Sequence, residues 1–221
     1  MSILILLLAI VPAEAGDNLN PASEEIFTEF KFIPPQDGKK PQTKGAGTRN
    51  PDALRCNAKD SEALAIMPED NYGLTVRERP EIFVLLPKTA AKQVVLSFES
   101  QDKEYHQVAF LPVDPNSKIQ SFALPQDKLG LESDRYYQWK LTLVCGNLPH
   151  VDDPVLSGWV RRQEADLNTS EIANRASIAQ AQWYGINGYW YDLLWQIKQI
   201  ETNNYRDIST VDIWSILEKK Y

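Results

Sequence analysis

The sequence has only two histidines and two cysteines among its 221 residues. It contains no Gly-x-Ser-x-Gly element, which disfavours a serine hydrolase of the α/β-hydrolase type. It also contains no glycine-rich stretch leading into Gly-Lys-Ser or Gly-Lys-Thr, so the phosphate-binding loop of nucleotide hydrolases is absent. The formal net charge of −7 argues against a nucleic-acid-binding protein, which normally has a basic face. We therefore predict no catalytic residue and no cofactor from these patterns.

Long apolar runs are also missing, apart from one at the start of the chain. Residues Ile3–Val11 are apolar without interruption, a run too short to cross a bilayer as a helix. Pro12 ends the run, and Ala13–Ala15 fits a small-x-small cleavage site before Gly16. No Lys or Arg precedes the run, so an uncleaved anchor and a segment without targeting function are the alternatives. We predict a signal peptide over residues 1–15 and a soluble periplasmic or extracellular protein without a transmembrane segment.

The two cysteines, Cys56 and Cys145, lie far apart in the sequence. In an exported chain, a single pair of cysteines most often forms a disulfide. The loop-entropy relation gives roughly 4–5 kcal/mol of stabilisation for a loop of this length, as an upper estimate. Two buried free thiols are the alternative. A catalytic cysteine is disfavoured because neither residue lies in a known nucleophile motif.

The clearest pattern in the chain lies between Leu131 and Cys145. From Tyr137 to Leu143, every second residue is apolar or aromatic, and the residues between them are Gln, Lys and Thr. Alternation with a period of two over this length predicts a central β-strand with one buried face. The spacing from Leu131 to Tyr137 also resembles the tyrosine corner of immunoglobulin-like and fibronectin-type sandwiches. In that motif, a tyrosine near the start of a strand bonds its hydroxyl to the backbone upstream.

Other short apolar stretches, separated by Pro, Asp and Asn, surround this strand. The expected strands are residues 64–67, 81–86, 93–99, 105–111, 118–124 and 155–161, with a turn at 69–73. Strands at this spacing predict an immunoglobulin-like antiparallel β-sandwich over about residues 60–163. Residues 16–59 are expected to be an N-terminal extension and a basic Pro/Gly-rich linker. An anion-binding nest is the alternative interpretation of the Lys and Arg residues in this linker.

After Glu164 the apolar period changes from 2 to 3.6, which predicts a helical C-terminal element over residues 164–221. A first helix, capped by Asn168 or Ser170, would end near Ile186 with Ala179 and Trp183 on its buried face. Asn187–Gly188 is typical of a left-handed helix stop. A second helix is expected over about 189–202, and a third is expected to start at Ser209. We expect these three helices to pack on the sandwich.

Several short motifs occur in order from Ile33 to the C-terminus. They are Ile33–Gly38, Gly45–Arg49, Arg55-Cys56, Leu86-Pro87, Leu124-Pro125, Tyr136–Trp139, Leu143–Cys145, Gly158–Arg162 and Asn187–Asp192. In order and spacing they resemble a cyanobacterial family, domain of unknown function 928. This sequence has Gly-Ala-Gly-Thr-Arg where the family pattern is Gly-Gly-Thr-Arg. The resemblance implies an exported protein made of a signal peptide and this one module, and it carries over no catalytic or binding residues.

Two groups of residues are candidates for a site. Tyr184, Tyr191 and Trp195 lie in an aromatic-rich stretch and are less well explained by the apolar face of the helices. Exposed together, they would form a contact surface for a protein or a glycan. The alternative is that the residues of this stretch fix the helices to each other and to the sandwich, as we expect of Trp183, Trp190 and Leu194.

The second candidate is the loop that contains His150, Asp152 and Asp153. A histidine beside two aspartates is a weak metal candidate, and a solvated hairpin loop is the alternative. A pair of catalytic carboxylates that meet only in three dimensions also stays open. The function that we expect is a non-enzymatic interaction module of the cell envelope that binds protein or glycan. The alternatives are a cell-envelope hydrolase and a structural accessory subunit.

Overall fold

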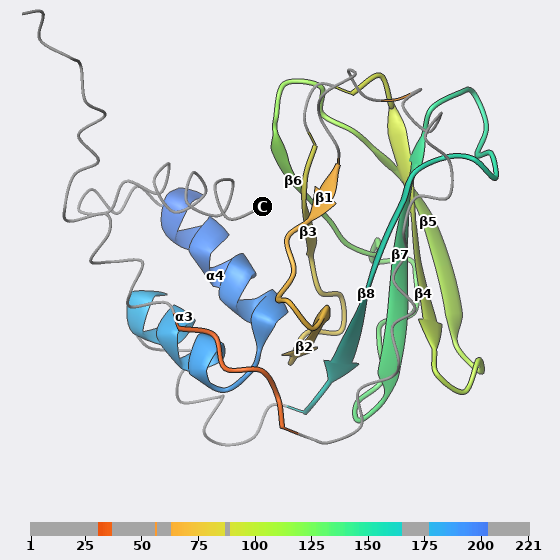
Figure 1. Ribbon diagram of the computed structural model, residues 1–221. Coiled ribbons are helices and arrows are strands. Elements are labelled where there is room, and N and C mark those ends of the chain that lie inside the picture. The colour runs from red at the N-terminus through yellow and green to blue at the C-terminus, as the bar shows by residue number, and fades with distance from the viewer. Residues whose placement is uncertain (1–30, 37–55, 57–62, 87–88, 165–176, 203–221) are drawn as a thin grey trace, which may run out of the picture.

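The computed structural model describes residues 31–36, 56, 63–86, 89–164 and 177–202 (Figure 1). Two β-sheets face each other as a sandwich, and two helices lie beside it (Figure 1). The three-stranded sheet has the order β1 (Leu64–Ala65), β3 (Ile82–Leu85), β6 (Ile119–Phe122). The five-stranded sheet has the order β2 (Tyr72–Thr75), β8 (Val155–Arg162), β7 (Tyr136–Val144), β4 (Gln93–Ser100), β5 (His106–Pro112).

Strand β7 is the centre of the larger sheet, paired antiparallel with β4 on one side and β8 on the other. Its side chains Tyr137, Trp139, Leu141 and Leu143 are fully buried between the sheets, whereas Lys140 is exposed. The alternation predicted from the sequence is therefore confirmed. A side-chain period of two places one face of the strand in the core and the other toward solvent.

Strand β2 corrects the predicted turn at residues 69–73, because Tyr72 and Gly73 already belong to a strand. Asn71 makes the turn, with a φ of 55°, and its side-chain amide donates to the carbonyl of Ser157 at 2.9 Å. β2 then pairs parallel to β8, so the sandwich is not purely antiparallel. All four residues of β2 are buried, and a strand buried on both faces shows no alternation by which the sequence could reveal it.

Two helices, α3 (Ser177–Ile186) and α4 (Trp190–Thr202), form a hairpin in the described residues. The connection turns at Gly188, whose φ of +82° confirms the predicted left-handed stop. The structure therefore shows two C-terminal helices where the sequence predicts three. The third helix, expected from Ser209, and the beginning of the first helix lie outside the described residues.

The buried face of α3 differs from the predicted one. Ala179 is exposed and Trp183 half-buried, whereas Ala181 and Tyr184 are buried. The buried Gly185 lies against the segment 31–36, whose Ile33 N–H donates to the Gly185 carbonyl at 3.0 Å. A Cβ atom at position 185 would lie 2.6 Å from the carbonyl oxygen of Lys31, so the close approach requires glycine here.

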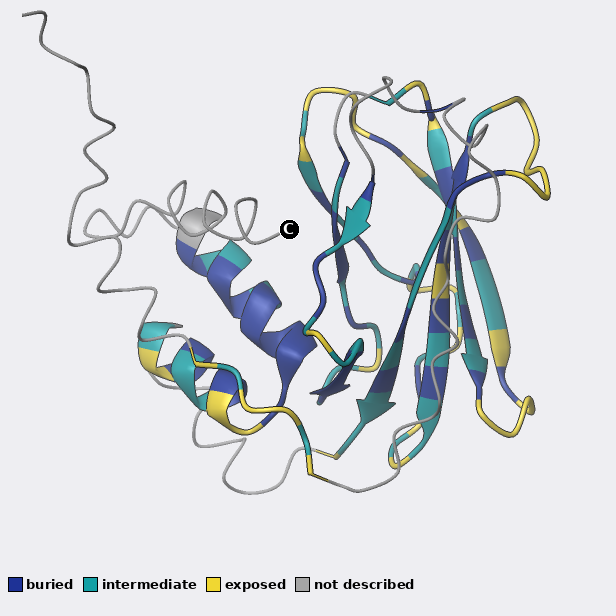
Figure 2. Ribbon diagram, in the orientation of Figure 1, coloured by how far each residue is buried: buried dark blue, intermediate teal, exposed yellow. Residues whose placement is uncertain are grey.

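Helix α4 is buried over almost its whole circumference, as its dark colour in Figure 2 shows. The predicted apolar face is confirmed, since its members are all buried: Trp190, Leu193, Leu194, Ile197 and Ile200. Tyr191, Asp192 and Gln196, which lie outside that face, are buried as well. A helix buried on all sides is part of the core rather than a cover for it. Neither described helix is long and apolar enough to cross a membrane.

Candidate functional site

The predicted aromatic contact surface is wrong for two of its three members. Tyr191 is only 1% exposed and Tyr184 is also buried. The Tyr191 hydroxyl accepts a hydrogen bond from Trp139 Nε1 at 2.7 Å and donates to the carbonyl of Trp159 at 2.9 Å. Tyr191 thus packs against β7 and β8, and burial raises the pKa of its hydroxyl. These contacts give Tyr191 a structural role in joining α4 to β7 and β8.

Trp195, the third member, is half-buried and covered by an arginine. The Arg77 guanidinium carbon lies 3.5 Å from the centre of the Trp195 ring, and Arg77 Nε lies 3.3 Å from Asp192 Oδ1. Asp192 is fully buried, and its Oδ2 accepts the Val76 N–H at 3.1 Å. The charge pair and the cation–π contact therefore join α4 to the chain that follows β2. Because Arg77 occupies one face of the Trp195 ring, that face is not available for stacking on a glycan.

The buried carboxyl of Asp192 is a weaker acid than an ordinary aspartate. Burial raises its pKa from 3.8 to about 6, and the nearby Arg77 guanidinium opposes that rise. The folded protein therefore binds this proton more tightly than the unfolded chain does. The contribution of Asp192 to stability is largest below the unfolded pKa and is lost as the pH rises through the folded pKa.

We expect the contribution of Asp192 to the free energy of unfolding to decrease between about pH 4 and pH 6. Urea unfolding of the wild-type protein and of Asp192→Asn at a series of pH values measures it. The free energy of unfolding of the wild type minus that of the variant should fall as the pH rises through that window and stay level above it. A constant or rising difference would show that the Asp192 carboxyl titrates normally or is stabilised as the anion.

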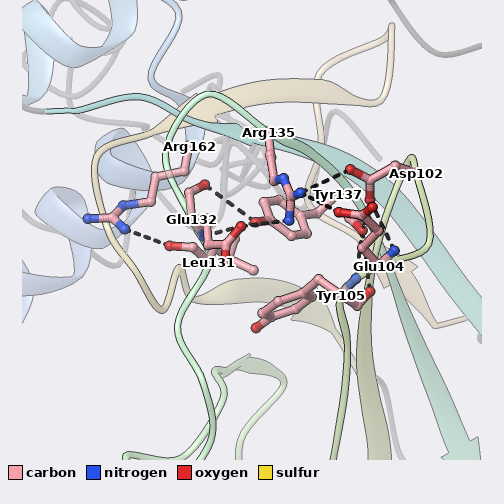
Figure 3. Close-up of polar contacts among 9 residues, drawn as sticks. Asp102, Glu104, Tyr105, Leu131, Glu132, Arg135, Tyr137 and Arg162 are labelled. Atoms are coloured by element: carbon pink, nitrogen blue, oxygen red, sulfur yellow. Dashed lines mark hydrogen bonds and ion pairs between the residues drawn. The ribbon is translucent and has the colours of Figure 1, made fainter.

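The start of β7 forms the tyrosine corner predicted from the sequence (Figure 3). The Glu132 N–H donates to the Tyr137 hydroxyl oxygen at 2.8 Å, five residues upstream along the chain. Arg162, at the end of β8, donates to the carbonyl of Leu131 at 2.6 Å. The corner thus fixes the loop before β7 against the neighbouring strand, which is a structural role.

A group of carboxylates lies beside this corner and shares one cation (Figure 3). The Arg135 guanidinium lies 2.6 Å from Glu132, 2.8 Å from Glu104 and 3.2 Å from Asp102. The Ser100 hydroxyl and the Glu104 N–H donate to Asp102 and lower its pKa. These contacts tie the β4–β5 hairpin to the loop before β7. They engage each of the three acids with a cation, which suits a structural role better than general acid–base chemistry.

At the opposite end of β7, a disulfide joins Cys56 and Cys145, the pair predicted from the sequence. Cys145 directly follows β7, whereas Cys56 belongs to neither sheet. The Ala90 N–H also donates to the carbonyl of Cys56, at 2.5 Å. The bond therefore fastens the N-terminal part of the chain to the end of the central strand, and it anchors the first residue of the β7–β8 loop.

The weak metal candidate lies in this loop, but its side chains are used otherwise. The buried carboxylate of Asp153 turns inward and accepts the N–H groups of Cys145 at 3.3 Å and His150 at 2.8 Å. His150 Nδ1 accepts the Asp152 N–H at 3.3 Å. Among the described residues there is no group of three His, Cys, Asp or Glu side chains that could hold a metal ion. These contacts stabilise the loop itself.

The residues that sequence reasoning missed lie at the tip of the same loop. Leu148 is 78% exposed and Val151 is 93% exposed. We call these two residues the apolar loop tip; the loop stands away from the sandwich and is largely yellow in Figure 2. Its conformation is fixed by the inward carboxylate of Asp153 and by the disulfide at Cys145. The signal in the sequence was two apolar residues in a segment that otherwise reads as a polar hairpin loop.

The comparisons with known proteins identify the family of this chain. A family model described as Domain of Unknown Function (DUF928) matches residues 44–220, well over half of the chain. The chain belongs to the DUF928 family. The matched region contains both cysteines, the apolar loop tip, and every strand and helix of the described residues. The site described above is therefore part of the DUF928 domain itself.

No curated protein matches this DUF928 chain. Among solved structures, the chain is similar to the fibronectin type III (fn3) domain of the human collagen alpha-1(XX) chain. The identity is 17%, the match covers 50% of this chain and 92% of that domain, and the TM-score is 0.28.

Proposed function

We propose that this DUF928 protein is an exported, non-enzymatic interaction module whose apolar loop tip binds another protein in the cell envelope. The observation that carries the proposal is a pair of apolar side chains, 78% and 93% exposed, on a loop with a fixed conformation. Single exposed apolar residues are common on protein surfaces. Two of them on one loop, held by a buried carboxylate and a disulfide, form a pre-organised contact.

The size of the contact can be estimated from burial. Enclosing Leu148 and Val151 in a partner's pocket would contribute about 1.5–3 kcal/mol for each side chain. Because every 1.4 kcal/mol is a factor of ten, the tip accounts for roughly a hundredfold to ten-thousandfold in affinity. His150 lies between the two tip residues and Asp152 follows them, and their side chains are 62% and 49% exposed. They would supply the polar rim that surrounds the apolar centre of a protein interface.

The disulfide supports a location outside the cytosol. Stable disulfides form in oxidising compartments and are rare in the cytosol. Together with the export signal expected over residues 1–15, this supports a location in the periplasm or outside the cell. Residues 1–15 lie outside the described part of the chain, so this step of the proposal rests on the sequence pattern.

A protein partner fits the described residues better than the alternatives do. A glycan platform needs an open aromatic face, whereas Arg77 covers Trp195 and Tyr191 is buried. A hydrolase needs carboxylates directed at a substrate, whereas Asp153 and the three acids around Arg135 are engaged in structural contacts. A structural accessory subunit would also bind protein and differs only in the permanence of the complex.

The test is capture of partners from a detergent-solubilised envelope fraction with four immobilised proteins. We expect wild type and Leu129→Asp to retain the same protein, and Leu148→Asp and Val151→Asp to lose it by roughly tenfold or more each. Leu129 is the matched control, because it is 68% exposed and lies in the loop before β7, at the other end of the sandwich.

All four proteins should melt within about 2 °C of one another, since the substituted side chains make no buried contacts. Equal retention by all four proteins would contradict the proposal. Loss of retention by Leu129→Asp as well would show that added charge, rather than the loop tip, is responsible.

A further inference from the structure

Strand β5 is the last strand of the larger sheet, and its sequence is unusual for that place. It pairs with β4 along its whole length and has no second strand partner among the described residues. Its seven residues, His-Gln-Val-Ala-Phe-Leu-Pro, include no Asp, Glu, Lys or Arg. Edge strands are usually protected from pairing by charged residues, bulges or prolines along the strand. Here the only such device is Pro112, at the very end.

The hydrogen bonds at the two ends of the β4–β5 pair show which backbone groups face outward. Ser100 N–H donates to the Tyr105 carbonyl, and Val113 N–H donates to the Lys92 carbonyl, both at 3.0 Å. Bonded and non-bonded pairs alternate along an antiparallel ladder. In the observed register, Ala109 then belongs to a pair bonded to β4. The N–H and C=O groups of Val108 and Phe110 therefore point away from β4, toward the free edge.

The side chains at this edge are apolar as well. Phe110 is 60% exposed and Val108 is partly buried, and both lie on the outer face of the sheet because they are two residues apart. Ala109, between them, is buried on the inner face. The free edge thus combines backbone groups that have no partner among the described residues with an exposed aromatic and a β-branched side chain.

We propose that β5 pairs antiparallel with β5 of a second copy of this chain, about a two-fold axis at Ala109. In this register Val108 lies opposite Phe110 of the second copy, and the two residues exchange a pair of backbone hydrogen bonds. The same pair occurs again on the other side of the axis. Aromatic and β-branched side chains directly opposite each other stabilise antiparallel strands. The two five-stranded sheets would become one continuous sheet.

A second copy fits this edge because the strand is complementary to itself in the two-fold register. With a formal net charge of −7, two copies repel each other at long range, so they associate most easily through a surface without carboxylates. β5 is such a surface, and in a two-fold pair no like charges within the strand lie opposite each other. A strand pair alone buries less area than a standard stable interface, so we expect a reversible dimer rather than a permanent one.

Sedimentation velocity of the chain with its disulfide intact, over roughly a hundredfold range of concentration, tests this inference. We expect the apparent mass of the wild type to rise toward twice that of one chain. Val108→Pro removes an N–H that faces the free edge and leaves the ladder to β4 intact, so it should stay monomeric. Phe110→Lys should do the same by adding like charges across the axis.

Thr142→Lys is the matched control. Thr142 is in register with Val95, which is in register with Phe110, so it lies on the same face of the sheet but away from the edge. We expect this variant to dimerise like the wild type. A wild type that is monomeric throughout would overturn the inference, as would dimers of both Val108→Pro and Phe110→Lys. Neither Val108→Pro nor Phe110→Lys changes the apolar loop tip, so the sedimentation result does not depend on the result of partner capture.

Discussion

Replacing Tyr191 by alanine is expected to lower the free energy of unfolding by about 3–5 kcal/mol. The side chain is fully buried, so its loss leaves a cavity where α4 enters the sandwich. Its hydroxyl also joins Trp139 Nε1 to the carbonyl of Trp159. Tyr191→Phe keeps the ring but leaves these two groups without that partner, and should cost about 1–3 kcal/mol.

Urea unfolding, followed by tryptophan fluorescence, measures both losses. Ile186→Ala is a suitable control, because Ile186 is 48% exposed on the neighbouring helix and its truncation should change stability by about 0.5 kcal/mol or less. A loss below about 1 kcal/mol for Tyr191→Ala would show that α4 is not part of the core. The sequence pattern alone predicts that small loss, since it places Tyr191 off the apolar face of its helix.

Removing the disulfide is the second large change. We expect Cys56→Ser with Cys145→Ser to lower the free energy of unfolding by about 2–5 kcal/mol, because the bond closes a long loop in the unfolded chain. For a protein of this size, that corresponds to a fall of roughly 5–20 °C in melting temperature. Both sulfur atoms are at least partly buried, so the new hydroxyls add a desolvation cost.

The melting temperature with and without a reductant tests this expectation. The wild type should lose stability when reduced, and the double variant should be indifferent to the reductant. Thiol titration of the denatured, unreduced wild type should find no free thiol. A wild type that melts at the same temperature in both conditions would contradict a stabilising bond. Because Cys145 anchors the β7–β8 loop, reduction should also weaken partner capture through the apolar loop tip.

The features that the sequence predicts correctly are those with a local pattern. The alternation of β7 gives its buried face, the Leu131-to-Tyr137 spacing gives the tyrosine corner, and Gly188 gives the helix stop. The export context suggests the pairing of Cys56 with Cys145. For the first three features, the interaction that decides the structure lies within a few residues of the pattern. For the disulfide, the chain has only two cysteines, so only one intramolecular pairing is possible.

The features that the sequence does not predict depend on distant partners. β2 is a strand because β8 pairs with it, more than eighty residues along the chain, and its four buried residues have no period. Asp192 reads as an ordinary helix residue until Arg77 is placed beside it. The helical period identifies one apolar face of α4, but the helix is surrounded on nearly all sides.

The contact residues expected from the sequence differ from those of the apolar loop tip for a related reason. Aromatic side chains suggest a contact surface by their composition, yet in this chain Tyr184 and Tyr191 contribute to the core. Leu148 and Val151 are ordinary apolar residues that no motif distinguishes. Their importance follows from exposure, and exposure is known only when the loop is placed by Asp153 and Cys145.

The most direct test of the proposed function is photocrosslinking with a photoreactive amino acid placed at position 151 in the full chain, in intact cells. We expect a covalent adduct with a specific protein at position 151, and loss of that adduct when Leu148→Asp is added. The same photoreactive residue at position 129 should give no adduct. Absence of an adduct at position 151, or an equal one at position 129, would contradict a role of the apolar loop tip in binding.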